Sequence, residues 1–208
     1  MGSRARQLSL GIEVRNGWGG RRRGAGRKPR GTKPGVSHRP RTGVCLRKPL
    51  HVALRVRPHV WNLRSRRSLR VFETALRAIR NRGDFRVAHF SVQGNHVHLL
   101  VETSGRVSLA AGMRSVAIRL ARGLNSMMGT RGAVLDDRYY SRVLGTPTEV
   151  RRALGYVLGN YRSHACRRGE KVHPEFVDRF ASSCPDNRQL VVEPRTWLLR
   201  VGRRRRRA

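Results

Sequence analysis

The chain has 208 residues, of which 46 are lysine or arginine and 12 are aspartate or glutamate, so its formal net charge is +34. This length fits one domain of ordinary size with basic extensions. No apolar run approaches the roughly 20 residues that cross a bilayer, and three scattered cysteines make no disulfide framework, which disfavours membrane-spanning and disulfide-stapled classes. The first residues lack the apolar stretch of a secretory signal, so we expect a cytoplasmic protein.

The basic excess consists almost entirely of arginine, because only four of the 46 basic residues are lysines. A planar guanidinium offers parallel donors to phosphate and loses its hydration more easily than an ammonium. We therefore expect a polyanionic partner, with nucleic acid as the default, bound largely through counterion release. A genomic bias toward arginine, with the charge merely solvated, is the alternative explanation.

Residues 1–49 are basic and rich in glycine and proline, which predicts a disordered basic arm that cannot bury enough apolar surface to fold. Within this arm, residues 26–31 are loosely similar to the AT-hook, a short segment that lies in the DNA minor groove. Arg27, Lys28 and Arg30 are therefore candidate DNA contacts. The block Arg203 to Arg207 at the other end is interpreted as a nonspecific phosphate contact.

Between residues 50 and 167 the hydrophobic periodicity predicts seven elements in the order β-α-β-β-α-β-α, over residues 51–57, 68–83, 85–93, 96–102, 108–129, 139–144 and 146–167. This order is typical of an α+β, ferredoxin-like or RRM-like fold with a four-stranded antiparallel sheet and an added helix. Gly94-Asn95 suits a tight hairpin turn, since both residues tolerate positive φ. Residues 146–149 form a capping box, a strong helix start, and residues 168–208 read as a C-terminal extension with an Arg-rich tail.

Two histidines lie two residues apart on the third predicted strand. The period of two sends His96 and His98 to one face, with their Cα atoms about 6.6 to 7 Å apart, close enough for two ring nitrogens to converge on one cation. We expect Arg55, Arg57 and His89 to share this polar, open face. Surface histidines on a nucleic-acid platform are the alternative interpretation, and the sequence leaves open whether Glu102 or His89 adds a proton or a ligand.

The last predicted helix carries Tyr156 and Asn160 at i and i+4, on the flank of its apolar stripe. A tyrosine at the edge of such a stripe can pack its ring and still expose its hydroxyl. A boundary tyrosine beside a merely solvated asparagine is the alternative. Tyr139, Tyr140 and Tyr161 are the competing nucleophiles.

His96-Val97-His98 resembles the HUH motif (His, hydrophobic, His) of single-tyrosine insertion-sequence transposases and of the related REP-associated tyrosine transposases. The segment from Tyr156 to Asn160 is similar to the helix that carries this family's nucleophilic tyrosine and, four residues later, an amide that completes the metal site. The resemblance covers about residues 50–167. Members of the REP-associated group often have proline after the asparagine, whereas this chain has Tyr161.

The resemblance implies a DNA strand transferase or nuclease in which His96, His98 and Asn160 hold Mg²⁺ or Mn²⁺ and Tyr156 attacks a phosphodiester. The product would be a 5′-phosphotyrosyl enzyme, and the substrate single-stranded DNA with an adjacent hairpin, bound by a monomer or homodimer at the nucleoid. A metal is needed in this scheme because a phenol is a poor nucleophile at neutral pH. The rival hypothesis is a non-catalytic DNA- or RNA-binding protein on the same fold, including a decayed transposase.

Overall fold

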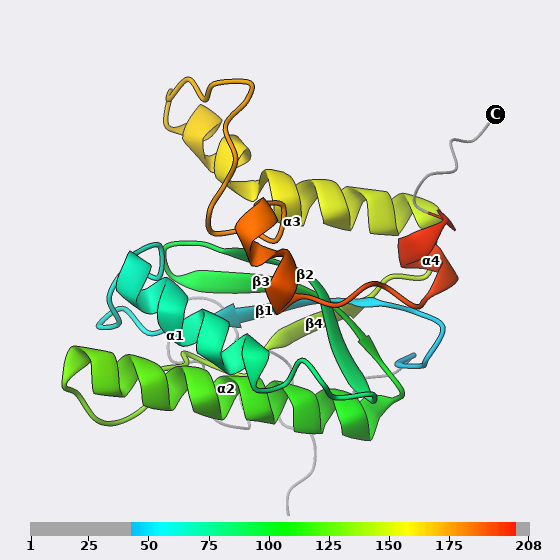
Figure 1. The fold of residues 1–208 in the computed structure, drawn as a ribbon, viewed down its shortest axis with the longest axis horizontal. Coiled ribbons are helices and arrows are strands. Elements are labelled where there is room, and N and C mark those ends of the chain that lie inside the picture. Colours follow the sequence, from blue (N-terminus) through cyan, green and yellow to red (C-terminus); the bar gives the residue numbers. More distant parts are fainter. Residues whose placement is uncertain (1–42, 203–208) are drawn as a thin grey trace, which may run out of the picture. The chain divides into compact units, whose positions relative to one another are not determined.

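The computed structural model describes residues 43–202, which are built around a four-stranded antiparallel sheet (Figure 1). The strands are β1 (Leu50–Arg55), β2 (Phe85–Val92), β3 (His96–Thr103) and β4 (Tyr140–Val143), in the spatial order β2-β3-β1-β4. With the helices between them, the order is β-α-β-β-α-β-α, so the predicted α+β fold is confirmed.

Within residues 43–202, five helical segments accompany the sheet: α1 (Arg66–Arg77), α2 (Arg106–Met128), α3 (Pro147–Arg167), a 3₁₀ segment η1 (Pro185–Leu190) and α4 (Trp197–Arg200). The predicted capping box of α3 is confirmed, since Thr146 accepts from the Glu149 amide and the Glu149 carboxylate accepts from the Thr146 amide. The helix predicted from residue 68 begins earlier: the cap of α1 is Ser65, whose hydroxyl accepts from the backbone N–H of Ser68.

Helices cover both faces of the sheet (Figure 1). On one face α1 and α2 pack on the alternating apolar residues of the strands, in a core that includes Val52, Leu54, Val97 and Leu99. On the other face α3 packs over β2 and β3, and a second, smaller core joins Ala88 and Leu100 with residues of α3 and α4. Leu100 lies on the same side of β3 as His96 and His98, which was expected to be open, whereas it is fully buried because α3 covers that face.

The turn between β2 and β3 differs from the expected hairpin, because neither Gly94 nor Asn95 has a positive φ. The Gly94 carbonyl accepts from Leu63 N at 2.8 Å, and the Asn95 carbonyl accepts from Val56 N at 2.9 Å. The turn is therefore held by bonds to the segment that follows β1, and these tertiary bonds, rather than local preference, set its conformation.

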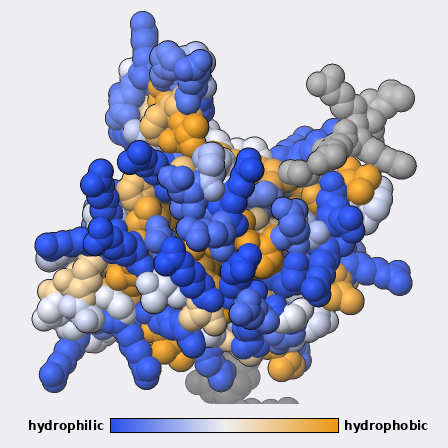
Figure 2. Space-filling view, in the orientation of Figure 1, coloured by the Kyte–Doolittle hydropathy of each residue, from blue (hydrophilic) through white to orange (hydrophobic). Residues whose placement is uncertain are grey.

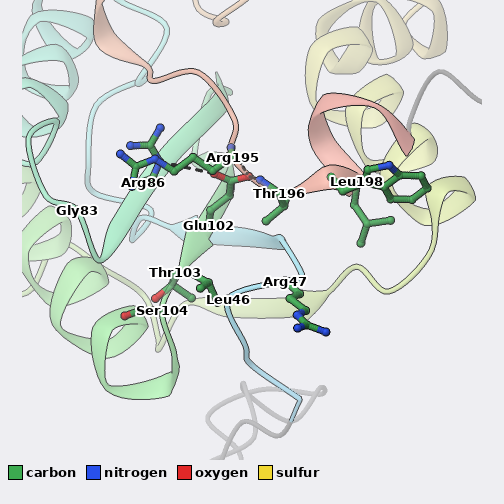
Figure 3. Close-up of a pocket in the computed structure, with 11 residues that line it drawn as sticks. Leu46, Arg47, Gly83, Arg86, Glu102, Thr103, Ser104, Arg195, Thr196 and Leu198 are labelled. Atoms are coloured by element: carbon green, nitrogen blue, oxygen red, sulfur yellow. Dashed lines mark hydrogen bonds and ion pairs between the residues drawn. The ribbon is translucent and has the colours of Figure 1, made fainter.

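Beyond α3, the chain returns to the sheet and is fixed there by two buried carboxylates. Asp178 receives two hydrogen bonds from Arg64, at 3.0 and 2.7 Å. Glu102 on β3 accepts from the backbone N–H groups of Arg195 and Thr196, with Arg86 at 3.6 Å. Figure 3 shows this Glu102 cluster. Residues 178–196 are thus tied to the same sheet that carries the predicted site.

The side of residues 43–202 seen in Figure 2 is covered mainly by hydrophilic side chains. Within that part of the chain, no helix has both the length and the apolar composition needed to cross a membrane. Three predictions from the sequence lie outside the described residues: most of the basic N-terminal arm, its candidate DNA contacts Arg27, Lys28 and Arg30, and the block from Arg203 to Arg207.

The close contact of α2 with the sheet makes Gly112 sensitive to substitution. A Cβ at this position would lie 2.1 Å from Cγ of the buried Phe85 ring, whereas a Cβ at Gly155 in α3 would meet no atom within 4 Å. We expect Gly112→Ala to destabilise the protein by about 1–3 kcal/mol through overpacking, and Gly155→Ala to stabilise it by about 0.5–1 kcal/mol. Thermal unfolding of both variants checks this, and equal melting temperatures would contradict the packing described.

Candidate active site

His96 and His98 lie side by side on β3, with ring centroids 4.7 Å apart, as the strand period predicts. The antiparallel register pairs Arg55 of β1 with His96 and Ala53 with His98. The predicted open face is wrong, however, because the His98 side chain lies in the layer between the sheet and α3 and is only 5% exposed. The pair therefore lies in a partly desolvated site.

Each histidine has a partner for its Nδ1 atom. His96 Nδ1 lies 2.8 Å from Asn95 Oδ1, so Nδ1–H donates and the Nε2 lone pair remains free. His98 Nδ1 lies 3.1 Å from Nε2 of His51 on β1. When His98 donates from Nδ1 to a neutral His51, the Nε2 lone pair of His98 is also free. Such second partners orient metal-binding imidazoles in many proteins.

Neither His51 nor Asn95 was expected in the site from the sequence. Strand alternation already put His51 on the same face of β1 as Ala53 and Arg55, but only the register between β1 and β3 brings it to His98. Asn95 was interpreted as a turn residue, and its side-chain contact with the following histidine could not be derived from turn preference.

Helix α3 brings Tyr156 to the same histidines and carries the buried Asn160 one turn farther along. The Tyr156 ring lies 5.0 Å from that of His98 and 5.8 Å from that of His51, both edge to face, and the residue is 48% exposed. Asn160 is 1% exposed, and neither its Oδ1 nor its Nδ2 has a hydrogen-bond partner. His98 Nε2 is likewise buried and unpartnered. Asn160 is thus not a solvated surface residue.

The other tyrosines are engaged elsewhere or lie farther away. Tyr161 stacks on Phe176 at 5.0 Å and lies beneath the guanidinium of Arg64. Tyr139 packs against the larger core. Tyr140 on β4 pairs with Ala53, two strands from His98, which separates their Cα atoms by about 10 Å. Tyr156 is therefore the tyrosine whose ring contacts the histidine group.

Burial keeps these imidazoles neutral. Desolvation, followed by the charges of His96, His51 and His164, lowers the pKa of His98 to about 3. Desolvation also lowers the pKa of His96, with His164 and Arg55 adding to the effect, and lowers the pKa of His51, with Arg142 adding to it. Neutral imidazoles are the form that binds a metal ion.

The donors fit a divalent cation. Two imidazole nitrogens and one amide oxygen supply three ligands and leave positions for phosphate and water. A buried polar atom without a partner costs about 1–3 kcal/mol, and His98 Nε2 and Asn160 Oδ1 are both atoms of this kind that a metal ligand role would satisfy. Among residues 43–202 no group of three or more His, Cys, Asp or Glu is arranged to hold a metal, so this set depends on the asparagine.

The remaining candidates lie around this group rather than in it. The Arg55 side chain is exposed, 3.9 Å from Asp136, and Arg57 Nε donates to the Leu135 carbonyl. His89 Nδ1 lies 3.4 Å from Ser182 Oγ, and the Glu102 carboxylate holds the C-terminal segment. The contacts of His89 and Glu102 are thus with the C-terminal segment, and neither side chain is seen to add a proton donor or a ligand to the histidine group.

The lowered pKa of His98 predicts a pH dependence of stability without metal. The unfolded chain binds a proton at His98 below about pH 6.5 and the folded chain only near pH 3, so the stability contribution is complete above pH 6.5. It is lost as the pH falls from 6.5 toward 3, by up to about 1.4 kcal/mol per pH unit. Urea unfolding in chelator at pH 7.0, 5.5 and 4.5 should give a shallower pH dependence for His98→Gln than for wild type. Parallel curves would contradict this.

Comparison with known proteins supports the fold. No family model matches the chain, and no curated protein matches it either. A solved REP-associated tyrosine transposase, bound to a REP hairpin, superposes with a TM-score of 0.53 at 12% identity, covering 71% of this chain and 82% of that chain. A putative transposase from Deinococcus radiodurans R1 gives a TM-score of 0.40 at 13% identity, covering 60% of this chain and 93% of that chain. By its fold, this chain is similar to the REP-associated tyrosine transposase.

Proposed function

We propose that this protein cleaves and rejoins single-stranded DNA with Tyr156 as its nucleophile, through a covalent 5′-phosphotyrosyl intermediate. The observation that carries the proposal is the contact of the half-exposed Tyr156 ring with His98, beside the buried and unpartnered Asn160. A tyrosine in contact with a neutral imidazole, a second imidazole beside it and an amide on the tyrosine's own helix are the groups that such a reaction needs.

In the proposed reaction each side chain has a separate role. The Tyr156 hydroxyl attacks phosphorus and releases its proton to solvent, while the 3′-oxygen of the preceding nucleotide leaves with the bonding electron pair and becomes a 3′-hydroxyl. Reversal onto another DNA end rejoins the strands without ATP, because the phosphotyrosyl bond retains the energy of the phosphodiester. His51 and Asn95 hold the two imidazoles in the orientation that leaves each Nε2 lone pair free.

His96, His98 and Asn160 would hold a divalent cation, Mg²⁺ or Mn²⁺. When bound, such an ion polarises a nonbridging phosphate oxygen and favours departure of the 3′-oxygen. Hard cations of this kind bind weakly to nitrogen ligands, so we expect binding in the presence of DNA to be stronger than in its absence.

The proposed substrate is DNA with a hairpin next to the cleaved strand, consistent with the REP hairpin bound to the similar transposase. Residues 50–167 would form the catalytic domain. Arg55 and Arg57 at the edge of the site would contact the DNA backbone, and Arg27, Lys28 and Arg30 of the N-terminal arm would add further phosphate contacts. With this charge, the protein would be found with DNA at the nucleoid.

Substitution of the nucleophile tests the proposal directly. Incubation with labelled hairpin-bearing single-stranded DNA and Mn²⁺, followed by a denaturing gel, should give a covalent band for wild type and none for Tyr156→Phe. Tyr140→Phe is the matched control, since both tyrosines are 48% exposed and only Tyr156 contacts the histidines. DNA binding should be nearly equal in all three proteins. Adduct retained in Tyr156→Phe would refute the assignment, and no adduct in wild type would favour the non-catalytic binding protein.

Metal removal and ligand substitution form a second test. Chelator should abolish the adduct, and His96→Ala, His98→Ala and Asn160→Ala should each lower adduct formation by at least about 100-fold at fixed Mn²⁺, because each removes a ligand. His51→Leu should raise the Mn²⁺ concentration needed for half-maximal binding, followed by electron paramagnetic resonance, by about 10- to 100-fold. His51→Gln keeps an acceptor near His98 and should recover part of this loss. Equal Mn²⁺ binding by His51→Leu and wild type would refute the orienting role.

A further inference from the structure

A polar cavity of about 410 Å³ opens beside His96, within the range of volumes that hold small organic groups. It lies between the loop after β1, the turn before β3 and the C-terminal half of α3. Its lining includes three residues with amide side chains, Asn62, Gln93 and Asn95, together with His164 on α3 and Arg168 at the C-cap of that helix.

One wall of this cavity is formed by Arg64 and Tyr161, which are held in place by several contacts. Arg64 donates two hydrogen bonds to Asp178, and its guanidinium lies 4.3 Å from the Tyr161 ring centroid and 4.5 Å from that of Phe180. Arg64 is only partly exposed, and its charge is already compensated by the buried Asp178. This wall therefore supplies a fixed surface rather than an uncompensated cation for phosphate.

The chemistry of the lining favours a nucleoside. Each amide can donate two hydrogen bonds and accept two, and the single side-chain bond found for each of Asn62, Gln93 and Asn95 leaves capacity for a ligand. Such amides match the mixed donors and acceptors on base edges. Arg168, at the exposed rim, pairs with Glu170. The interior of the cavity thus suits a neutral polar group better than a phosphate.

The position of the cavity relative to Tyr156 is defined by α3. Tyr156, Asn160 and His164 recur every four residues and so lie in one row, with a rise of about 6 Å at each step. Tyr156 contacts His98 and His51, whereas His164 lies 6.5 Å from His96, ring to ring. The nucleophile and the cavity are therefore on opposite sides of the buried Asn160.

We propose that this cavity binds the nucleoside whose 3′-oxygen leaves when Tyr156 attacks, an inference that rests on the proposed function. In an in-line displacement the attacking and leaving oxygens lie on opposite sides of phosphorus. The Tyr156 oxygen–phosphorus bond forms as the phosphorus–O3′ bond breaks, and the 3′-oxygen takes up a proton from water. The cavity then retains the new 3′-terminal nucleoside, with its hydroxyl near the phosphotyrosine for rejoining.

Photochemical crosslinking from the 3′ end of DNA tests the location. The probe is a dodecathymidylate with 4-thiothymidine at its 3′ terminus, and a second probe carries 6-thiodeoxyguanosine there. The full-length chain with Tyr156→Phe is irradiated with each probe, and the crosslinked peptides are mapped by mass spectrometry. We expect attachment within residues 62–64, 93–96 or 161–168, and a different site when 4-thiothymidine is placed at the 5′ end. Attachment of both 3′-terminal labels elsewhere would overturn the proposal.

A matched pair of amide variants in the same background adds a second readout. Asn62→Ala removes a lining amide and should lower the affinity for the better 3′-terminal probe by about 3- to 10-fold. Gln189→Ala removes an exposed amide of η1, outside the cavity lining, and should leave the affinity unchanged. Equal affinities of the two variants, with equal melting temperatures, would refute the subsite. The covalent-band assay keeps the two proposals apart: cavity crosslinks without a wild-type adduct would refute catalysis and the leaving-nucleoside role, and would leave the cavity only as a binding site for a 3′-terminal nucleoside.

Discussion

The packing of α3 on the second face of the sheet is the interaction on which the site depends. Leu100 and Ala88 form a small core with Val150, Val157 and their neighbours. This apolar contact fixes the rotation of α3 about its own axis. Tyr156 and Asn160 lie next to the apolar stripe, so this rotation buries Asn160 and leaves Tyr156 half exposed. The packing of α3 also shields the His98 side chain from solvent. A helix that buried a different stripe would separate the tyrosine from the histidines although every strand remained in place.

The segment that follows α3 also helps to position the site. Asp178 holds Arg64 by hydrogen bonds, and the Arg64 guanidinium packs on the ring of Tyr161. Tyr161 is therefore part of the wall of the cavity beside His96 rather than a competing nucleophile. At the opposite end of β3, Glu102 binds the backbone before α4, whose residue Leu199 enters the core under α3. Two charged anchors thus connect residues beyond 168 to the placement of α3, a dependence that the weak periodicity of this region did not reveal.

The element order and the side of β3 that carries the histidines followed from the sequence, because strand alternation and helix periodicity are local properties. The joining of Tyr156 and Asn160 to that face came from the family resemblance rather than from periodicity. What could not be derived was set by long-range pairing: the register that places His51 against His98, the tertiary bonds that shape the Gly94-Asn95 turn, and the burial of Leu100. Arg55 and His96 were expected on one face, and their direct pairing across the strands needed the same register.

The large positive charge of the chain and the neutrality of its histidines are connected. Arg55 and Arg142 lower the pKa of His96 and His51 in the same direction as burial does, so the arginines that would attract DNA also oppose protonation of the imidazoles. A bound phosphate would act in the opposite direction, because a nearby anion raises the pKa of an imidazole. A divalent cation between the imidazoles and the phosphate would offset that effect. If DNA and a divalent cation bind as proposed, they would bind cooperatively, since each would remove the electrostatic cost that the other imposes on the same two histidines.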